Sequence, residues 1–122
     1  MRLFSVFSKL PEIAERYSTE NVPEGEKLTK RTLQIGAVRY RKCVAINIDA
    51  QGFYFRIHMV FGKYPQIFIP WKELRDIQES KIYGTRAKQF SIGDPPVGTI
   101  RIPEEIFNKM KGYFFDCYVP DF

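Results

Sequence analysis

Nucleophilic catalysis needs a side chain such as a cysteine thiol beside a base, and this sequence offers one such pair. Cys43 and the only histidine, His58, fall on outward-facing positions of two consecutive predicted strands. A hairpin would bring them together, and a thiol beside an imidazole is the pair that cysteine hydrolases use. No third residue is marked as a partner that would orient the base. A Cys–His hydrolase is therefore the last of the alternatives, and we expect a protein that is not an enzyme.

Motifs for cofactors and metals are missing from the sequence. It contains no glycine-rich phosphate loop, no HExxH and no GxSxG. Cys43 and Cys117 have no CxxC spacing, and with one histidine they cannot supply a zinc site. We expect no cofactor and no metal. Whether the two cysteines form a disulfide stays open, and free thiols are the simpler interpretation.

Positive charge is concentrated in the first half of the chain. Residues 27–72 hold nine lysines and arginines and one acid, Asp49, which gives this segment +8 against +5 for the whole chain. An outward face shared by Arg39, Arg41 and Arg56 would attract an anionic membrane lipid. The structural alternative is a solvated sheet face whose charges protect a strand edge. The candidate anion-binding or lipid-binding residues are Lys30, Arg31, Arg39, Arg41 and Arg56.

Nucleic acid is a less favoured partner for the same segment. Tyr54 lies beside Arg56 and could stack a base. The cations are too dispersed to favour this interpretation.

Aromatic residues gather near both ends of the chain. The last eleven residues hold five aromatic side chains. Such an apolar tail either folds back onto the domain or meets another chain. A protein partner or a homo-oligomer is therefore the first prediction. The candidate interface residues are Phe4, Phe7, Tyr113, Phe114, Phe115, Tyr118 and Phe122.

Two helices are predicted. Leu10, Ile13, Ala14 and Tyr17 recur at helical spacing, which indicates a short helix over about 9–18, followed by a linker. A second helix over 103–111 begins with a proline and two glutamates, and Gly112 follows its end.

Between these helices the apolar residues alternate, as in strands. Even positions from Tyr40 to Ile48 are mostly apolar, and alternation resumes at Phe53 after a turn, which predicts a β-hairpin with one buried face. Short strands at about ten-residue spacing favour an antiparallel sandwich or small barrel. The further strands are predicted at 66–71, 77–83, 86–92 and 98–102.

The only tryptophan marks the end of one of these strands. Ile67, Ile69 and Trp71 are in phase, and Pro70 lies where the strand should leave its ladder. We expect Trp71 to fill the core, with Leu74 turning back to cover it.

Several of these segments resemble a known family. Segments 38–44 (VRYRKCV), 52–55 (GFYF) and 67–71 (IFIPW), with Leu74, look like an uncharacterised family of small bacterial proteins assigned a pleckstrin-homology-like (PH-like, or GRAM-like) domain. The resemblance covers roughly residues 10–105. It implies a mainly β fold: a small antiparallel barrel of six or seven strands capped by a C-terminal helix, with a short N-terminal helix.

The resemblance also bears on ligands. PH-like folds often bind inositol lipids through basic residues on the first two strands, where Lys30, Arg31, Arg39 and Arg41 would lie. This chain departs from that pattern, because Gly36 shortens the joining loop and no lysine cluster fills it.

The domain and function predictions follow together. We expect one domain made of a helix and linker (1–26), a PH-like barrel with its capping helix (27–112) and an aromatic tail (113–122). The predicted function is a non-catalytic binding or assembly module. The apolar runs are too short for a transmembrane helix or a signal peptide. This predicts a cytoplasmic protein, or one peripheral at the inner face of the membrane.

Overall fold

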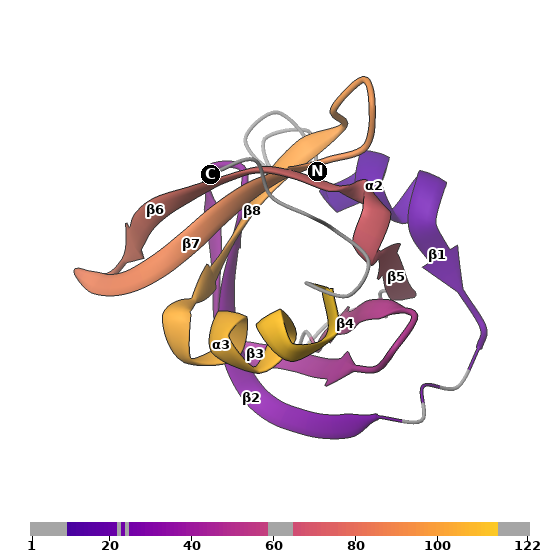
Figure 1. The fold of residues 1–122 in the computed structure, drawn as a ribbon, viewed down its shortest axis with the longest axis horizontal. Coiled ribbons are helices and arrows are strands. Elements are labelled where there is room, and N and C mark those ends of the chain that lie inside the picture. Colours follow the sequence, from indigo (N-terminus) through magenta and orange to yellow (C-terminus); the bar gives the residue numbers. More distant parts are fainter. Residues whose placement is uncertain (1–9, 22, 24, 59–64, 115–122) are drawn as a thin grey trace.

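The fold is a single antiparallel sheet curled into a half-barrel, with two helices (Figure 1). It is seen in a computed structural model that describes residues 10–21, 23, 25–58 and 65–114. The order across the sheet is β1-β5-β4-β3-β2-β8-β7-β6. The elements are α2 (Leu10–Tyr17), β1 (Ser18–Thr19), β2 (Glu26–Ile35), β3 (Val38–Ile48), β4 (Gly52–Ile57), β5 (Gln66–Pro70), the 3₁₀ turn η1 (Trp71–Glu73), β6 (Leu74–Ile82), β7 (Thr85–Ile92), β8 (Gly98–Pro103) and α3 (Glu104–Phe114).

The prediction of a mainly β protein is confirmed, and the described residues contain eight strands where six or seven were expected. The additional strand is β1, whose Ser18 pairs with Ile67 and Thr19 with Gln66. The predicted first helix was thus one residue too long, because Ser18 leaves it to pair with β5. Residue 9 lies outside the described part.

The sheet consists of two meanders, β2 to β5 and β6 to β8. They are joined where the end of β2 pairs with β8, at Gln34↔Arg101 and Ile35↔Ile100. Directly after this joint Gly36 turns the chain with a φ of 59°, and its N–H donates to the carbonyl of Thr99 at 3.0 Å. A positive φ here suits glycine, which has no Cβ to clash.

The predicted hairpin of β3 and β4 is confirmed, with two corrections. Tyr40, Val44 and Ile46 are buried as the alternation predicts. Lys42 is exposed, because the ladder between β2 and β3 is irregular there and Lys42 has a φ of 55°. The opposite face is also partly buried, since the amide of Asn47 donates to the carbonyls of Gly25 and Glu26. The stretch before β2 therefore lies on a face that was expected to be polar and open.

The C-terminal helix α3 contacts both halves of the sheet. It packs on β4, β7 and β8 and buries Ile106, Phe107 and Met110. Its predicted bounds were wrong at both ends: Pro103 still belongs to β8, and Gly112 lies within the helix. Gly112 does not have the positive φ with which a glycine commonly ends a helix, and the helix continues to Phe114. No helix among the described elements is long and apolar enough to cross a membrane.

Trp71 is in the core, as predicted. Its side chain is 2% exposed, and its indole N–H donates to the carbonyl of Asp49 at 3.1 Å. Its ring stacks on that of Tyr113, with the centroids 6.3 Å apart and the planes at 11°. Ile69 and Leu74 are buried beside it. The strand therefore ends at Pro70 so that a large ring can close this part of the core.

Candidate functional site

The Cys43–His58 pair is adjacent, but its thiol is not activated. The N–H of His58 donates to the carbonyl of Cys43 at 2.7 Å, so the hairpin brings the two residues together. Burial raises the pKa of the Cys43 thiol, whereas a nucleophilic cysteine needs a lowered one. Cys43 is a free thiol, and Cys117 lies outside the described residues. Within the described ranges no three of the His, Cys, Asp and Glu side chains are grouped to hold a metal.

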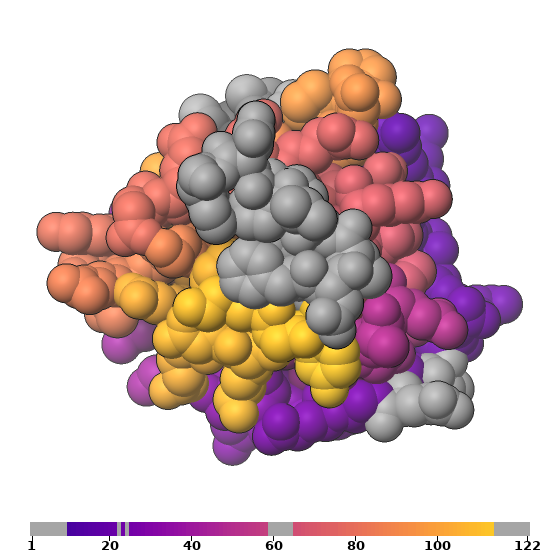
Figure 2. All heavy atoms as spheres, in the orientation of Figure 1, coloured from indigo at the N-terminus to yellow at the C-terminus, as the bar shows by residue number. Residues whose placement is uncertain are grey.

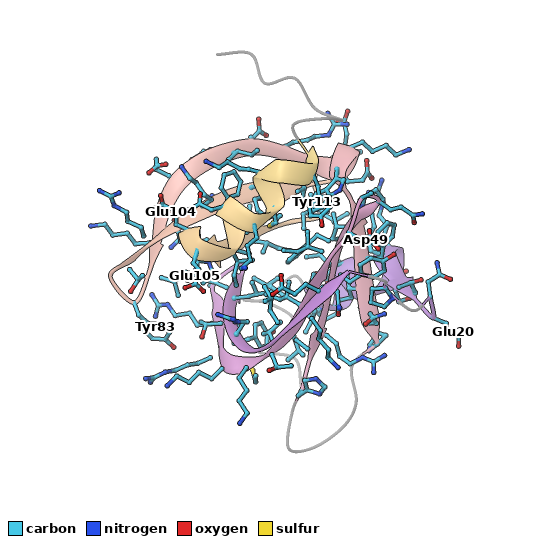
Figure 3. All side chains as sticks on the ribbon, turned by 60° about the horizontal axis from the view of Figure 1, so that its bottom comes forward. Glu20, Asp49, Tyr83, Glu104, Glu105 and Tyr113 are labelled. Atoms are coloured by element: carbon cyan, nitrogen blue, oxygen red, sulfur yellow. The ribbon has the colours of Figure 1, made fainter. Side chains whose placement is uncertain are left out.

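Arg39 and Arg41 meet at Tyr83, at the tip of the β6–β7 hairpin. The guanidinium carbons of Arg39 and Arg41 lie 5.0 and 5.5 Å from the centroid of the Tyr83 ring. Both are within the range in which a cation is attracted by the face of an aromatic ring. Tyr83 is 55% exposed, and the tip stands at the edge of the molecule (Figures 1 and 3). Tyr83 was not among the predicted site residues.

The backbone of Tyr83 is unfavourable for its residue type. Tyr83 and Gly84 form a two-residue loop between the paired residues Ile82 and Thr85, with φ of 51° and 77°. Two positive φ angles define a type I′ turn, in which the first position favours asparagine or aspartate. A bulky side chain in the left-handed region is uncommon. Turn geometry alone therefore does not explain a tyrosine at this position.

A hollow of about 200 Å³ adjoins this ring. Arg86 lines it and adds a third cation, and Thr32 and Thr85 add hydroxyl groups. The Nε of Arg39 donates to Gln34 Oε1 at 3.3 Å, which helps to hold its guanidinium beside Tyr83. We call Arg39, Arg41, Tyr83, Arg86 and the hollow the Tyr83 surface. Figure 2 shows that the β6–β7 hairpin, which carries Tyr83 and Arg86, projects from the body.

The other predicted anion-binding residues lie elsewhere. Arg31 is paired with Glu105 at 2.9 Å, which ties β2 to α3. Lys30 is exposed with a φ of 54°. Arg56 lines a separate cleft with Lys27 and His58. The expected patch of Arg39, Arg41 and Arg56 is therefore divided between two places.

Tyr54 cannot serve as an exposed stacking platform. It is 4% exposed, and its ring packs against Phe68 with the centroids 4.5 Å apart. The proposed base-stacking role of Tyr54 beside Arg56 is wrong for this reason.

Of the predicted interface residues, only Tyr113 has a described side chain. It is 40% exposed and rests on Trp71. Phe114 ends α3, and nothing is described of its side chain. The remaining candidates, Phe4, Phe7, Phe115, Tyr118 and Phe122, lie outside the described residues.

Comparison of the chain with family models, with curated proteins and with solved structures finds no match. Its function is therefore argued from its own residues.

Proposed function

We propose that the protein is a non-catalytic binding module that holds an acidic segment of a partner protein on the Tyr83 surface. The observation that carries the proposal is the pair of guanidiniums, those of Arg39 and Arg41, against an exposed ring with an unfavourable backbone. Backbone strain of this kind tends to be kept at functional sites.

The chemistry of these side chains suits a carboxylate-rich partner. Among the described residues, no Asp or Glu forms an ion pair with Arg39 or Arg41. Guanidinium groups bind carboxylates through two parallel hydrogen bonds. Tyrosine and arginine are also the residue types that contribute most to protein interfaces. The Tyr83 surface thus combines a flat ring with cations that form no ion pair with a described residue.

The PH-like assignment is part of this proposal. The curled antiparallel sheet with a C-terminal helix packed on β4, β7 and β8 supports it. Burial raises the pKa of the Cys43 thiol, which argues against this residue as a nucleophile. The cytoplasmic location stays a prediction.

The test is binding of a fluorescent Glu-rich peptide, followed by anisotropy at low and moderate salt. The double variant R39Q/R41Q should lose about tenfold in affinity or more, which corresponds to about 1.4 kcal/mol. The matched control is K72Q/R75Q, which removes the same charge from two exposed residues elsewhere. An equal loss in both double variants would show that only net charge matters and would reject the Tyr83 surface.

An anionic membrane surface is the second candidate partner. The observation in its favour is the position of Tyr83 at the tip of a hairpin at the edge of the molecule (Figure 3), since tyrosine suits a membrane–water interface. Co-sedimentation with phosphatidylserine vesicles and with phosphatidylcholine vesicles tests it. Binding that needs the anionic lipid, falls with salt and is lost in R39Q/R41Q would favour the membrane. Binding that ignores lipid charge would reject it.

Self-association through the aromatic tail stays a prediction. Light scattering of the full chain against a chain shortened after Gly112 tests it, and a monomer in both cases would reject it.

A further inference from the structure

A second cleft lies on the other face of the β3–β4 hairpin from the core. It has a volume of about 320 Å³ and is lined by residues of β2 to β5, by His58, and by Thr19, Glu20, Asn21 and Pro23. This volume is at the lower end of the range for small-molecule sites, roughly 300–1,000 Å³. Arg86 and the other residues of the Tyr83 surface do not line it, so it is a separate site.

The charged side chains that line the cleft are mostly positive. Lys27 and Arg56 line it from β2 and β4, on either side of β3. In the part of the chain that the structure describes, neither cation has an ion-pair partner within 4.0 Å. Glu20 also lines the cleft, and Figure 3 shows it at the outer edge of the molecule. A concave site with one dominant sign of charge raises the local concentration of counter-ions. The cleft therefore favours an anion.

Two amide side chains in the cleft indicate which polar groups a ligand would need besides its negative charge. The NH₂ group of Asn47 donates to the carbonyls of Gly25 and Glu26, each at 3.3 Å. The NH₂ group of Gln66 donates to the carbonyl of Asn21 at 2.8 Å. Both amides are thus held by the backbone through their nitrogen atoms. Their oxygen atoms accept no hydrogen bond from any described residue, and an amide oxygen can accept two.

We propose that this cleft binds a small polyhydroxylated anion, such as a sugar phosphate or a hydroxy acid. Its phosphate or carboxylate pairs with Lys27 and Arg56, and its hydroxyl groups donate to the oxygens of Asn47 and Gln66. An anion without hydroxyls would make no hydrogen bond to the two amide oxygens, and a neutral sugar would pair with neither cation. Recognition therefore needs both features in one molecule. The inference is independent of the partner proposed for the Tyr83 surface.

Matched probes test the two halves of this requirement. Amide and side-chain NMR shifts of the full chain are followed during titration with glucose 6-phosphate, glucose and inorganic phosphate, and separately with tartrate and succinate. We expect glucose 6-phosphate and tartrate to shift Lys27, Asn47, Arg56 and Gln66. Succinate, phosphate and glucose should each bind about tenfold more weakly or not at all, because each lacks one class of contact.

Variants locate the site. Both R56Q and K27Q remove a charge from the cleft and should weaken glucose 6-phosphate about tenfold, whereas R75Q removes the same charge from an exposed residue outside both surfaces and should leave the affinity unchanged. Lys27 and Arg56 are exposed, so both variants should fold. Equal affinity for tartrate and succinate, an equal effect of R56Q and R75Q, or shifts confined to the Tyr83 surface would each overturn the proposal.

Discussion

Tyr83 and Tyr113 are the two large apolar side chains that are exposed among the described residues. They differ in the residues that their rings contact. The ring of Tyr113 lies parallel to that of Trp71, which belongs to the core. The ring of Tyr83 lies against the guanidiniums of two exposed arginines. Figure 3 shows the two tyrosines well apart. Exposure alone therefore says little about function. The neighbours of the ring are more informative: Tyr113 covers a core residue, whereas Tyr83 lies beside cations at the surface.

The largest expected effect is at the Tyr113 end. Trp71→Ala should lower the free energy of unfolding by about 3–5 kcal/mol, because it removes a buried ring and leaves a cavity. Urea unfolding followed by circular dichroism measures this. A Trp71→Ala protein that kept its stability but lost a binding activity would make Trp71 a ligand platform and would erase the contrast with Tyr83.

Tyr113→Ala should have an intermediate effect. A stacked aromatic pair contributes about 0.5–1.5 kcal/mol beyond burial, and Tyr113 is only partly buried. A double-mutant cycle with Trp71→Phe isolates the coupling between the two rings. The same cycle made with Tyr83→Ala and Trp71→Phe is the control and should show no coupling.

A third tyrosine extends the comparison to pH. The hydroxyl of Tyr17, in α2, donates to Glu73 Oε1 at 2.8 Å. Burial, and then this hydrogen bond, raise the pKa of Tyr17 to about 12. Because the folded-state pKa lies above the ordinary value of 10.0, the stabilisation is complete below pH 10 and is lost as the pH rises towards 12.

Tyr17→Phe tests this hydrogen bond. It should lower the free energy of unfolding by about 1 kcal/mol at neutral pH and should flatten its decline between pH 10 and 12. Unfolding curves at several pH values measure both. An identical decline in Tyr17→Phe would assign it to other groups.

The smallest effect on stability is expected at Tyr83. Tyr83→Asn creates the Asn-Gly pair that a type I′ turn favours, and relief of strain worth about 1 kcal/mol offsets the loss of cation–π contacts worth about 0.5–1 kcal/mol each at exposed sites. The net change in unfolding free energy should therefore stay within about 1 kcal/mol, while binding of the Glu-rich peptide is lost. A large loss of stability would make Tyr83 a structural residue like Tyr113.

Local patterns in the sequence predicted most of the fold. The alternation from Tyr40 to Ile48 located β3, and the in-phase series ending at Trp71 identified a buried strand end correctly. Both depend on periodicity and turn chemistry, which are encoded within a few residues. The burial of Asn47 was missed, because it depends on Gly25 and Glu26, whose carbonyls come from a separate segment of the chain.

The candidate site was harder to predict than the fold. Arg39 and Arg41 were identified by charge, but their common partner Tyr83 comes from a hairpin more than forty positions later in the sequence. The available signal was the Tyr-Gly pair at the end of the predicted strand 77–83, and it was missed because Tyr83 was assigned to that strand and only Gly84 to the turn. Arg56 lies opposite Ala45, farther along β3 than Arg39 and Arg41, and periodicity does not show which cleft a side chain lines.

The joint between the two meanders affects the order in which the chain folds. Each meander pairs strands that are neighbours in sequence, whereas β2 and β8 meet through residues near 35 and 100. Closing so long a loop costs entropy before any contact compensates for it. We therefore expect each meander to form early and their joining to be the late step, which hydrogen exchange during refolding would follow at the amides of Gly36 and Ile100. During synthesis on a ribosome, the meander of β2 to β5 would therefore lack its contact with the second meander until β8 has been synthesised.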